Sequence, residues 1–374
     1  PSVADLRSML ASHPYDDALL IAYYDDGEHL WAFVMDQTIF ACIPLSVTCQ
    51  DLRLILDLLA RNFNSTVYEL EQQTDPYIQT PSLTALAQKL SSQLYNQLIQ
   101  PLWTYVKQHC HLVIVPFGEL HYLPFNTLYR KVDNSEDDNA VGAGDPEDNH
   151  YLIEHHDITL LPAISLLTVP PPRRPEGALV LAHSASGKRQ IIQTRREAEI
   201  VSGLMGGGDP LLEAAMLLDA LAAPPRQILH IASHGKYRLN RPGASLIQFA
   251  DGPLFADYLF QYDLSYELIT LSACETLRAK VTPGDDLIGL GRGFLYAGAG
   301  ALVASLWSVH DVTTCDLMQY FYEGLTRGKT KSAALSDAQR DLLKLHPYLH
   351  PALWGAFQLV GNPAPLSTAR PASL

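Results

Sequence analysis

The second half of the chain repeats one pattern, in which short apolar runs of strand length alternate with segments of helical spacing. The apolar runs are 178–182, 227–233, 268–273, 299–307 and 357–360, and the helical segments are 195–205, 286–298, 312–326 and 330–345. Strands that are apolar throughout are buried on both faces, as in a parallel sheet that is covered by helices on both sides. The pattern therefore predicts an α/β fold with a mainly parallel sheet.

The first half predicts less regular α/β structure. Residues 18–45 contain short apolar runs separated by two turn signals, which indicates strands and a hairpin. Residues 51–61 and 82–108 have helical spacing, and 111–116 is a short buried strand. We expect these strands to belong to a second α/β unit.

Two segments mark boundaries along the chain. Residues 131–150 hold seven acidic residues and one lysine, which predicts a solvated loop. The proline-rich stretch 170–175 predicts an extended linker. We therefore expect an N-terminal half over 1–169, a C-terminal half over 176–362, and a disordered tail over 363–374, which is rich in Pro, Ala and Ser.

Composition excludes several classes of protein. The net charge of −14 opposes the basic face that phosphate binding needs, so we expect no direct nucleic-acid partner. It would suit a basic protein substrate, although solubility alone explains it. No apolar run reaches the roughly 18 residues that span a bilayer, so no membrane partner is expected. Five scattered cysteines without a CxxC pair favour a reducing cytoplasm, and no motif predicts a metal or an organic cofactor.

Two predicted strands end in residues of nucleophilic catalysis. ILHIASHG places His234 and Gly235 after the first strand, and ITLSACET places Cys274 after the second. Because parallel strands end at the same edge of a sheet, His234 and Cys274 would emerge together if their strands are neighbours. The imidazole would generate a thiolate, and the N–H groups of Gly235 and Cys274 would bind the oxyanion. Together they would form an acyl-transfer site, but each residue alone is more often structural, so the spacing leaves both interpretations open.

These two segments resemble the paired His and Cys boxes of the CHAT family, which is related to caspases and separases. Other segments resemble motifs of that family in the same order, namely 112–125, 151–156, 286–299, 303–311, 346–347 and 354–357. The resemblance implies a caspase-like cysteine endopeptidase that cleaves a protein substrate through a thioester, with His234 as general base and Cys274 as nucleophile. It also implies that the N-terminal half is a degenerate, inactive caspase-like unit that supports the active C-terminal half.

The resemblance also bears on substrate preference. Separases and metacaspases hold a basic residue before the scissile bond with an acidic group, and the matching positions here are Ser272 and Cys315. Asp311 lies near the second position without aligning on it. We therefore expect an uncharged or apolar residue before the cut. Trp307 is a further candidate for the pocket wall, with a place in the core as the simpler interpretation.

The resemblance leaves the partners and the activity open. CHAT proteins are commonly joined to tetratricopeptide repeats or other sensors, which implies an activating sensor or a repeat-containing partner. Bacterial members often act in regulated defence or cell-death pathways. Two alternatives remain: a catalytically silent scaffold or signalling module that acts through protein–protein interaction, and a Cys-based acyl transferase or amidohydrolase that acts on small amides.

Overall fold

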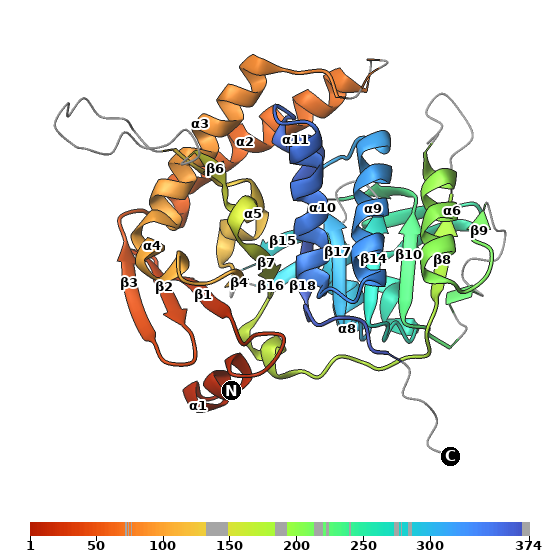
Figure 1. Cartoon of the computed structure of the whole chain (residues 1–374), viewed down its shortest axis with the longest axis horizontal. Helices are drawn as coiled ribbons and strands as arrows, with labels where there is room; N and C mark the ends of the chain where they lie inside the picture. The colour runs from red at the N-terminus through yellow and green to blue at the C-terminus, as the bar shows by residue number, and fades with distance from the viewer. Residues whose placement is uncertain are drawn as a thin grey trace.

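The structure is a computed structural model (Figure 1). It describes residues 1–71, 73, 75, 77–131, 149–183, 193–212, 220–221, 224–238, 241–272, 277, 279–282 and 286–368, with the backbone alone at 279–282 and 286–288. Within these residues, one 11-stranded sheet has the order β3-β2-β1-β4-β7-β18-β17-β14-β10-β8-β9. Its strands are β1 Ala18–Asp25, β2 Leu30–Met35, β3 Phe40–Leu45, β4 His111–Val115, β7 Asp157–Leu160, β8 Ala178–Ala182, β9 Leu211–Leu212, β10 Ile228–Ala232, β14 Leu268–Ser272, β17 Ala301–Ser305 and β18 Phe357–Gly361.

Small sheets and helices complete the fold. The short strands are β5 Tyr129–Arg130, β6 His150–Tyr151, β11 His234–Lys236, β12 Leu246–Phe249, β13 Gly252–Phe255, β15 Ala279–Thr282 and β16 Asp286–Gly289. The α-helices are α1 Val3–Leu10, α2 Cys49–Leu70, α3 Pro81–Leu98, α4 Trp103–Val106, α5 Leu152–His155, α6 Thr194–Met205, α8 Leu290–Tyr296, α9 Asp311–Thr326, α10 Lys331–Leu345 and α11 Pro351–Trp354. The 3-10 helices are η1 Gln100–Leu102, η2 Gly118–Tyr122, η3 Phe125–Thr127, η5 Ile164–Thr168, η6 Pro242–Ala244 and η7 Ala256–Gln261. No helix of the described chain is long and apolar enough to cross a bilayer.

The main sheet contains two sets of parallel strands that run in opposite directions. β8, β10, β14 and β17 are parallel to one another, and so are β1, β4 and β7. β18 lies between the two sets, antiparallel to β17 and parallel to β7. β8, β10, β14 and β17 therefore end at one edge of the sheet, and β1, β4, β7 and β18 end at the opposite edge. The predicted mainly parallel sheet is confirmed.

Helices cover both faces of the C-terminal part of the sheet. In Figure 1, α6, α9 and α10 lie in a row in front of its strands, and α9 packs against both of its neighbours. The connection through α6 leads outward from β8 to β9, whereas the connection through α8 leads inward from β14 to β17. Right-handed crossovers in opposite directions place their helices on opposite faces, so α8 covers the face that α6 and α9 leave open.

Two of the predicted helices differ from the observed elements. Residues 286–289 form β16, which pairs with β15 in a hairpin, and α8 begins only at Leu290. Three glycines within 289–293 weaken helix formation there, which leaves this backbone available for strand pairing. The predicted helix 82–108 is divided into α3, η1 and α4 near Pro101, which has no N–H to donate to a helical hydrogen bond.

Part of the predicted disordered tail is held in place, so that prediction is wrong for residues 363–368. The backbone N–H of Lys331 donates to the carbonyl of Pro363 (2.8 Å), and its Nζ donates to the carbonyl of Ala364 (2.6 Å). The N–H of Ser367 donates to a carboxylate oxygen of Glu267 (2.8 Å). Two buried charged side chains thus obtain partners from the tail. Residues 369–374, and residues 132–148 of the predicted acidic loop, lie outside the described residues.

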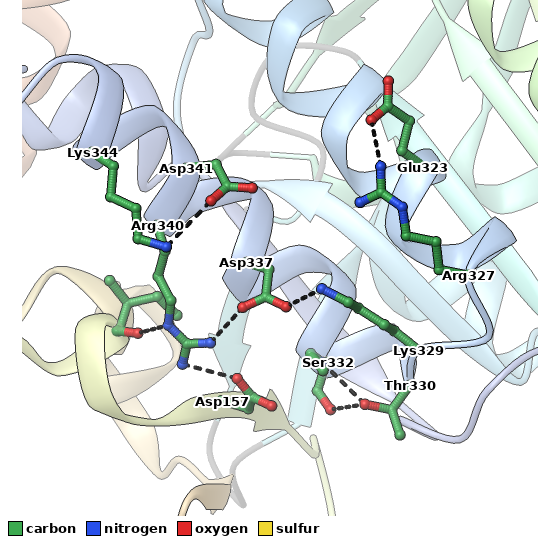
Figure 2. Close-up of polar contacts among 12 residues, drawn as sticks. Asp157, Glu323, Arg327, Lys329, Thr330, Ser332, Asp337, Arg340, Asp341 and Lys344 are labelled. Atoms are coloured by element: carbon green, nitrogen blue, oxygen red, sulfur yellow. Dashed lines mark hydrogen bonds and ion pairs between the residues drawn. The ribbon is translucent and has the colours of Figure 1, made fainter.

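A charged cluster joins the two halves where α10 meets β7 (Figure 2). The guanidinium of Arg340 lies 2.9 Å from Oδ1 of Asp157 and 2.9 Å from Oδ1 of Asp337, and its Nε donates to the carbonyl of Ile153 (2.6 Å). Lys329 contacts the other oxygen of Asp337. Because Asp157 begins β7 and Arg340 lies in α10, this cluster fastens the second half to the first.

Candidate active site

The two strands that were expected to carry the chemistry are neighbours. β10 and β14 pair in parallel, from Ile228 opposite Leu268 to Ala232 opposite Ser272. The N–H of Ser233 extends the pairing by donating to the carbonyl of Ser272 (3.2 Å). The chain therefore leaves both strands at the same edge and at the same level.

His234 lies at that edge, where the chain turns out of the main sheet. It is the first residue of β11, which pairs antiparallel with β12 so that His234 faces Gln248 and Gly235 faces Ile247. The hydroxyl of Ser233 donates to the carbonyl of Gln248 and fixes the turn. His234 and Gly235 are both half-buried, so each residue is partly exposed beyond the end of β10.

Cys274 lies outside the described residues, together with 273, 275 and 276. In the sequence it is the second residue after β14, just as His234 is the second residue after β10. The structure thus places the turn that carries His234 beside the end of β14, the strand that leads into Cys274. The last described residue before it, Ser272, is 8% exposed.

Trp307 occupies the core rather than an open pocket. Its side chain is 5% exposed, its Nε1 donates to the carbonyl of Ala352 (2.9 Å), and its ring lies 4.6 Å from that of Phe63. These contacts join the end of β17 to α2 and α11, and they favour the core interpretation of this residue.

The other two pocket candidates lie one turn apart on α9. Asp311 begins the helix and is partly exposed; burial raises the pKa of its carboxyl to about 6, and the charges of Glu197 and Glu71 add to this effect. Cys315 is 1% exposed, and burial raises the pKa of its thiol to about 12, with a further contribution from Glu197. Asp311 can therefore meet a ligand at the surface, whereas Cys315 is an uncharged core residue at neutral pH.

Four buried polar residues beneath this edge were missed by the sequence reasoning. Glu197, His230, Tyr322 and Thr270 form a chain of polar contacts that runs from α6 through β10 and α9 to β14. The available signal was a histidine inside the apolar run ILHIA, since an apolar strand rarely holds a polar side chain without a buried partner. Among the described residues, no group of three or more His, Cys, Asp or Glu side chains is arranged to bind a metal ion.

A cavity of about 530 Å³ is lined by residues that do not include His234. It opens at the ends of β4 and β7, and its wall includes Phe117, Pro162 and, from α8, Arg292 and Tyr296. The wall also includes Leu277, whose N–H donates to the carbonyl of Ser305 at the end of β17 (2.8 Å).

The opposed sets of parallel strands, the helices on both faces and the histidine at a strand end define a caspase-like α/β protein. The sequence profile of the CHAT domain matches residues 88–362, and the chain belongs to the CHAT domain family. The Saccharomyces cerevisiae separase–securin complex has a similar fold, with a TM-score of 0.59 and 12% identity over 96% of this chain and 30% of that one. A second structure of that complex gives a TM-score of 0.52, with 11% identity over 97% and 31% of the two chains.

Two curated relatives carry the same name. Tetratricopeptide repeat protein 28 of Homo sapiens is 25% identical over 328 residues, which cover 72% of this chain and 12% of the human protein. Its Mus musculus counterpart is 24% identical and is covered to 13% of its length. The chain thus spans about an eighth of the length of these relatives.

Proposed function

We propose that this protein is a cysteine endopeptidase, with Cys274 as its nucleophile and His234 as its general base. The observation that carries the proposal is the level, parallel pairing of β10 with β14, which leaves His234 beside the strand that leads into Cys274. A caspase-like fold supports it, because the carboxyl ends of parallel strands are where such folds gather reactive side chains.

The reaction would proceed in two acyl-transfer steps. The imidazole of His234 takes the proton of the Cys274 thiol, and the thiolate attacks the carbonyl carbon of the scissile peptide. The N–H groups of Gly235 and Cys274 bind the oxyanion, and the imidazolium then protonates the leaving amine. Water, deprotonated by the same imidazole, cleaves the thioester and restores the thiol. Gly235 suits the oxyanion site because it has no side chain to obstruct the substrate.

We further propose that the residue before the scissile bond is uncharged or apolar. The burial of Cys315 and Ser272 supports this, because neither position offers a charged group to a basic side chain. Asp311 is a nearby carboxylate that could bind a basic residue instead. A cleavage preference for Lys or Arg that is lost in Asp311→Asn would show that Asp311 binds the residue before the scissile bond. A peptide-library cleavage assay separates the two outcomes, with Cys274→Ala as the control.

The regulation of this activity is proposed from the relatives. Both are named for tetratricopeptide repeats, and this chain covers only 12% and 13% of their lengths. We therefore propose that a repeat-containing segment or partner acts as an activating sensor, within a cytoplasmic defence or cell-death pathway.

A thiol-directed activity probe tests the proposed function. Labelling should occur at Cys274 and disappear in His234→Ala, and protein substrate should be cleaved by the native chain but not by Cys274→Ala. If a correctly folded chain is neither labelled at Cys274 nor able to cleave, with or without a repeat-containing partner, the peptidase proposal is wrong and a silent scaffold is favoured.

A further inference from the structure

The two strands that lead to the proposed dyad each carry a polar side chain in their middle. His230 in β10 and Thr270 in β14 are directly paired across the sheet, and both are 0% exposed. The other residues of the two strands, ILHIA and LITLS, are apolar except for Ser272 at the end of β14. A buried polar group is costly unless it is hydrogen-bonded, so each of these side chains needs a partner.

Tyr322 of α9 provides that partner for both. Its hydroxyl donates to Oγ1 of Thr270 (2.8 Å) and lies 3.0 Å from Nδ1 of His230. The two rings are in edge contact, with centroids 5.5 Å apart. Burial raises the pKa of Tyr322 well above its usual range, so the phenol keeps its single hydrogen.

Counting hydrogens fixes the state of the histidine. Because the only phenol hydrogen is donated to Thr270, the oxygen of Tyr322 must accept from His230, and Nδ1 therefore carries a hydrogen. On the other side of the ring, Nε2 lies 3.1 Å from Oε1 of Glu197, whose side chain is 5% exposed. The two atoms meet as a close pair without the alignment of a hydrogen bond. Both atoms are buried, and neither has a hydrogen-bond partner among the described residues.

The resulting chain of contacts spans the elements around the proposed site. Glu197 belongs to α6, His230 to β10, Tyr322 to α9 and Thr270 to β14. His230 lies four residues before His234, and Thr270 lies four residues before Cys274. At a strand rise of about 3.3 Å per residue, the contacts hold the two strands together roughly 7 Å below their last residues, Ala232 and Ser272.

We propose that Glu197, His230, Tyr322 and Thr270 form a positioning unit that holds β10 in register with β14 and so keeps His234 at reacting distance from Cys274. The proposal rests on the proposed function. Buried polar groups can often be replaced by apolar ones without loss of stability, so a network of this kind is better explained by the position it defines. The four residues touch no substrate and act only through the two strands.

The test removes one hydroxyl at a time. Tyr322→Phe keeps the ring but loses both contacts, and Thr270→Val keeps the shape but loses the acceptor. Displacing a reacting group by about 1 Å can cost about 100-fold, so we expect kcat to fall by about that factor while KM is unchanged. The double variant should lose no more than Tyr322→Phe alone, because both changes remove the same hydrogen bond. Tyr348→Phe, the same change at a residue that is 69% exposed, is the matched control.

A second readout does not depend on peptide cleavage. The rate of iodoacetamide alkylation at Cys274 is followed against pH by mass spectrometry, which distinguishes it from alkylation at Cys42 and Cys110, two exposed cysteines. A thiolate paired with imidazole reacts at low pH, and loss of positioning should move the midpoint toward about 8.5, the ordinary thiol value. Thermal unfolding of each variant identifies those that remain folded at the assay temperature. If Tyr322→Phe does not fold, Thr270→Val decides.

The outcomes separate this proposal from the proposed function. A native chain with a low alkylation midpoint and peptide cleavage, both lost in folded Tyr322→Phe, supports the positioning unit. A folded variant that is less heat-stable but keeps both properties shows a merely structural role and overturns the positioning proposal alone. A native chain with an ordinary thiol midpoint and no cleavage overturns the proposed function, and the positioning proposal with it.

Discussion

Replacing Arg340 with alanine should weaken the joint between the two halves. The side chains of Arg340 and Asp157 are 18% and 21% exposed, and their nitrogen and oxygen lie 2.9 Å apart. Removing one partner of a buried pair costs about 3–5 kcal/mol, whereas exposed pairs contribute about 0–1 kcal/mol. For a pair that is four-fifths buried we expect a loss of about 2–4 kcal/mol in the free energy of unfolding. At about 2 °C per kcal/mol for a chain of this size, the thermal midpoint should fall by about 4–8 °C.

The pH dependence of that loss follows from Asp157. Burial raises the pKa of its carboxyl, and the charge of Arg340 only partly opposes the shift. Without Arg340 the pKa rises further, so the folded variant binds a proton more readily than its unfolded chain. A group with a raised carboxyl pKa destabilises the fold above that pKa and ceases to do so as the pH falls through it. The difference in the free energy of unfolding between Arg340→Ala and the native chain should therefore be largest at neutral pH and become smaller as the pH falls.

Thermal unfolding followed by circular dichroism at several pH values measures this effect. Arg327→Ala is the matched control, because Arg327 also pairs with a carboxylate, at 3.2 Å from Glu323, but is 64% exposed (Figure 2). Arg327→Ala should lower the free energy of unfolding by less than about 0.5 kcal/mol. Equal midpoints for the two variants would refute the argument that burial sets the strength of the Arg340 pair.

Three further changes test other parts of the structure. Trp307→Phe should cost about 1–3 kcal/mol through a lost core hydrogen bond, as measured by thermal unfolding, and should leave the cleavage preference of a peptide library unchanged. Asp311→Asn should stabilise the fold at pH 8, because the raised pKa of about 6 disfavours the ionised form there, and the gain should vanish near pH 4 in thermal unfolding. Truncation after residue 362 should lower the thermal midpoint, because Lys331 and Glu267 lose buried partners, and an unchanged midpoint would contradict the assignment of the tail.

The sequence predicted the strands of the C-terminal half well, for a physical reason. A strand that is buried on both faces is apolar throughout, so β10 and β14 are visible as continuous runs between polar turns. The direction in which a strand runs cannot be predicted from its own residues. β18 is as apolar as its neighbours, yet it runs antiparallel to β17, because that depends on how α9 and α10 return the chain.

Local composition was misleading where distant residues decide the structure. The tail is rich in Pro, Ala and Ser, but its place is fixed by Lys331, 33 residues before its acceptor Ala364, and by Glu267, 100 residues before Ser367. Both side chains are nearly inaccessible, at 1% and 3% exposure. A buried charge without a partner is costly, so the two residues hold a segment that composition alone assigned to disorder.

The same distinction explains which part of the candidate site could be found from the sequence. His234 and Cys274 were predicted because each lies two residues after its own strand, in a segment that resembles the family's His or Cys box, so the signal lies in consecutive residues. The side chains that support these two residues are far apart in the sequence. The contact between His230 and Tyr322 joins residues 92 apart, and it exists only because α9 packs over β10. A motif can name the groups that react, but the precision with which they meet depends on side chains that approach from other elements. The interior beneath the strands is therefore where variation among CHAT domains with the same His and Cys boxes should change kcat.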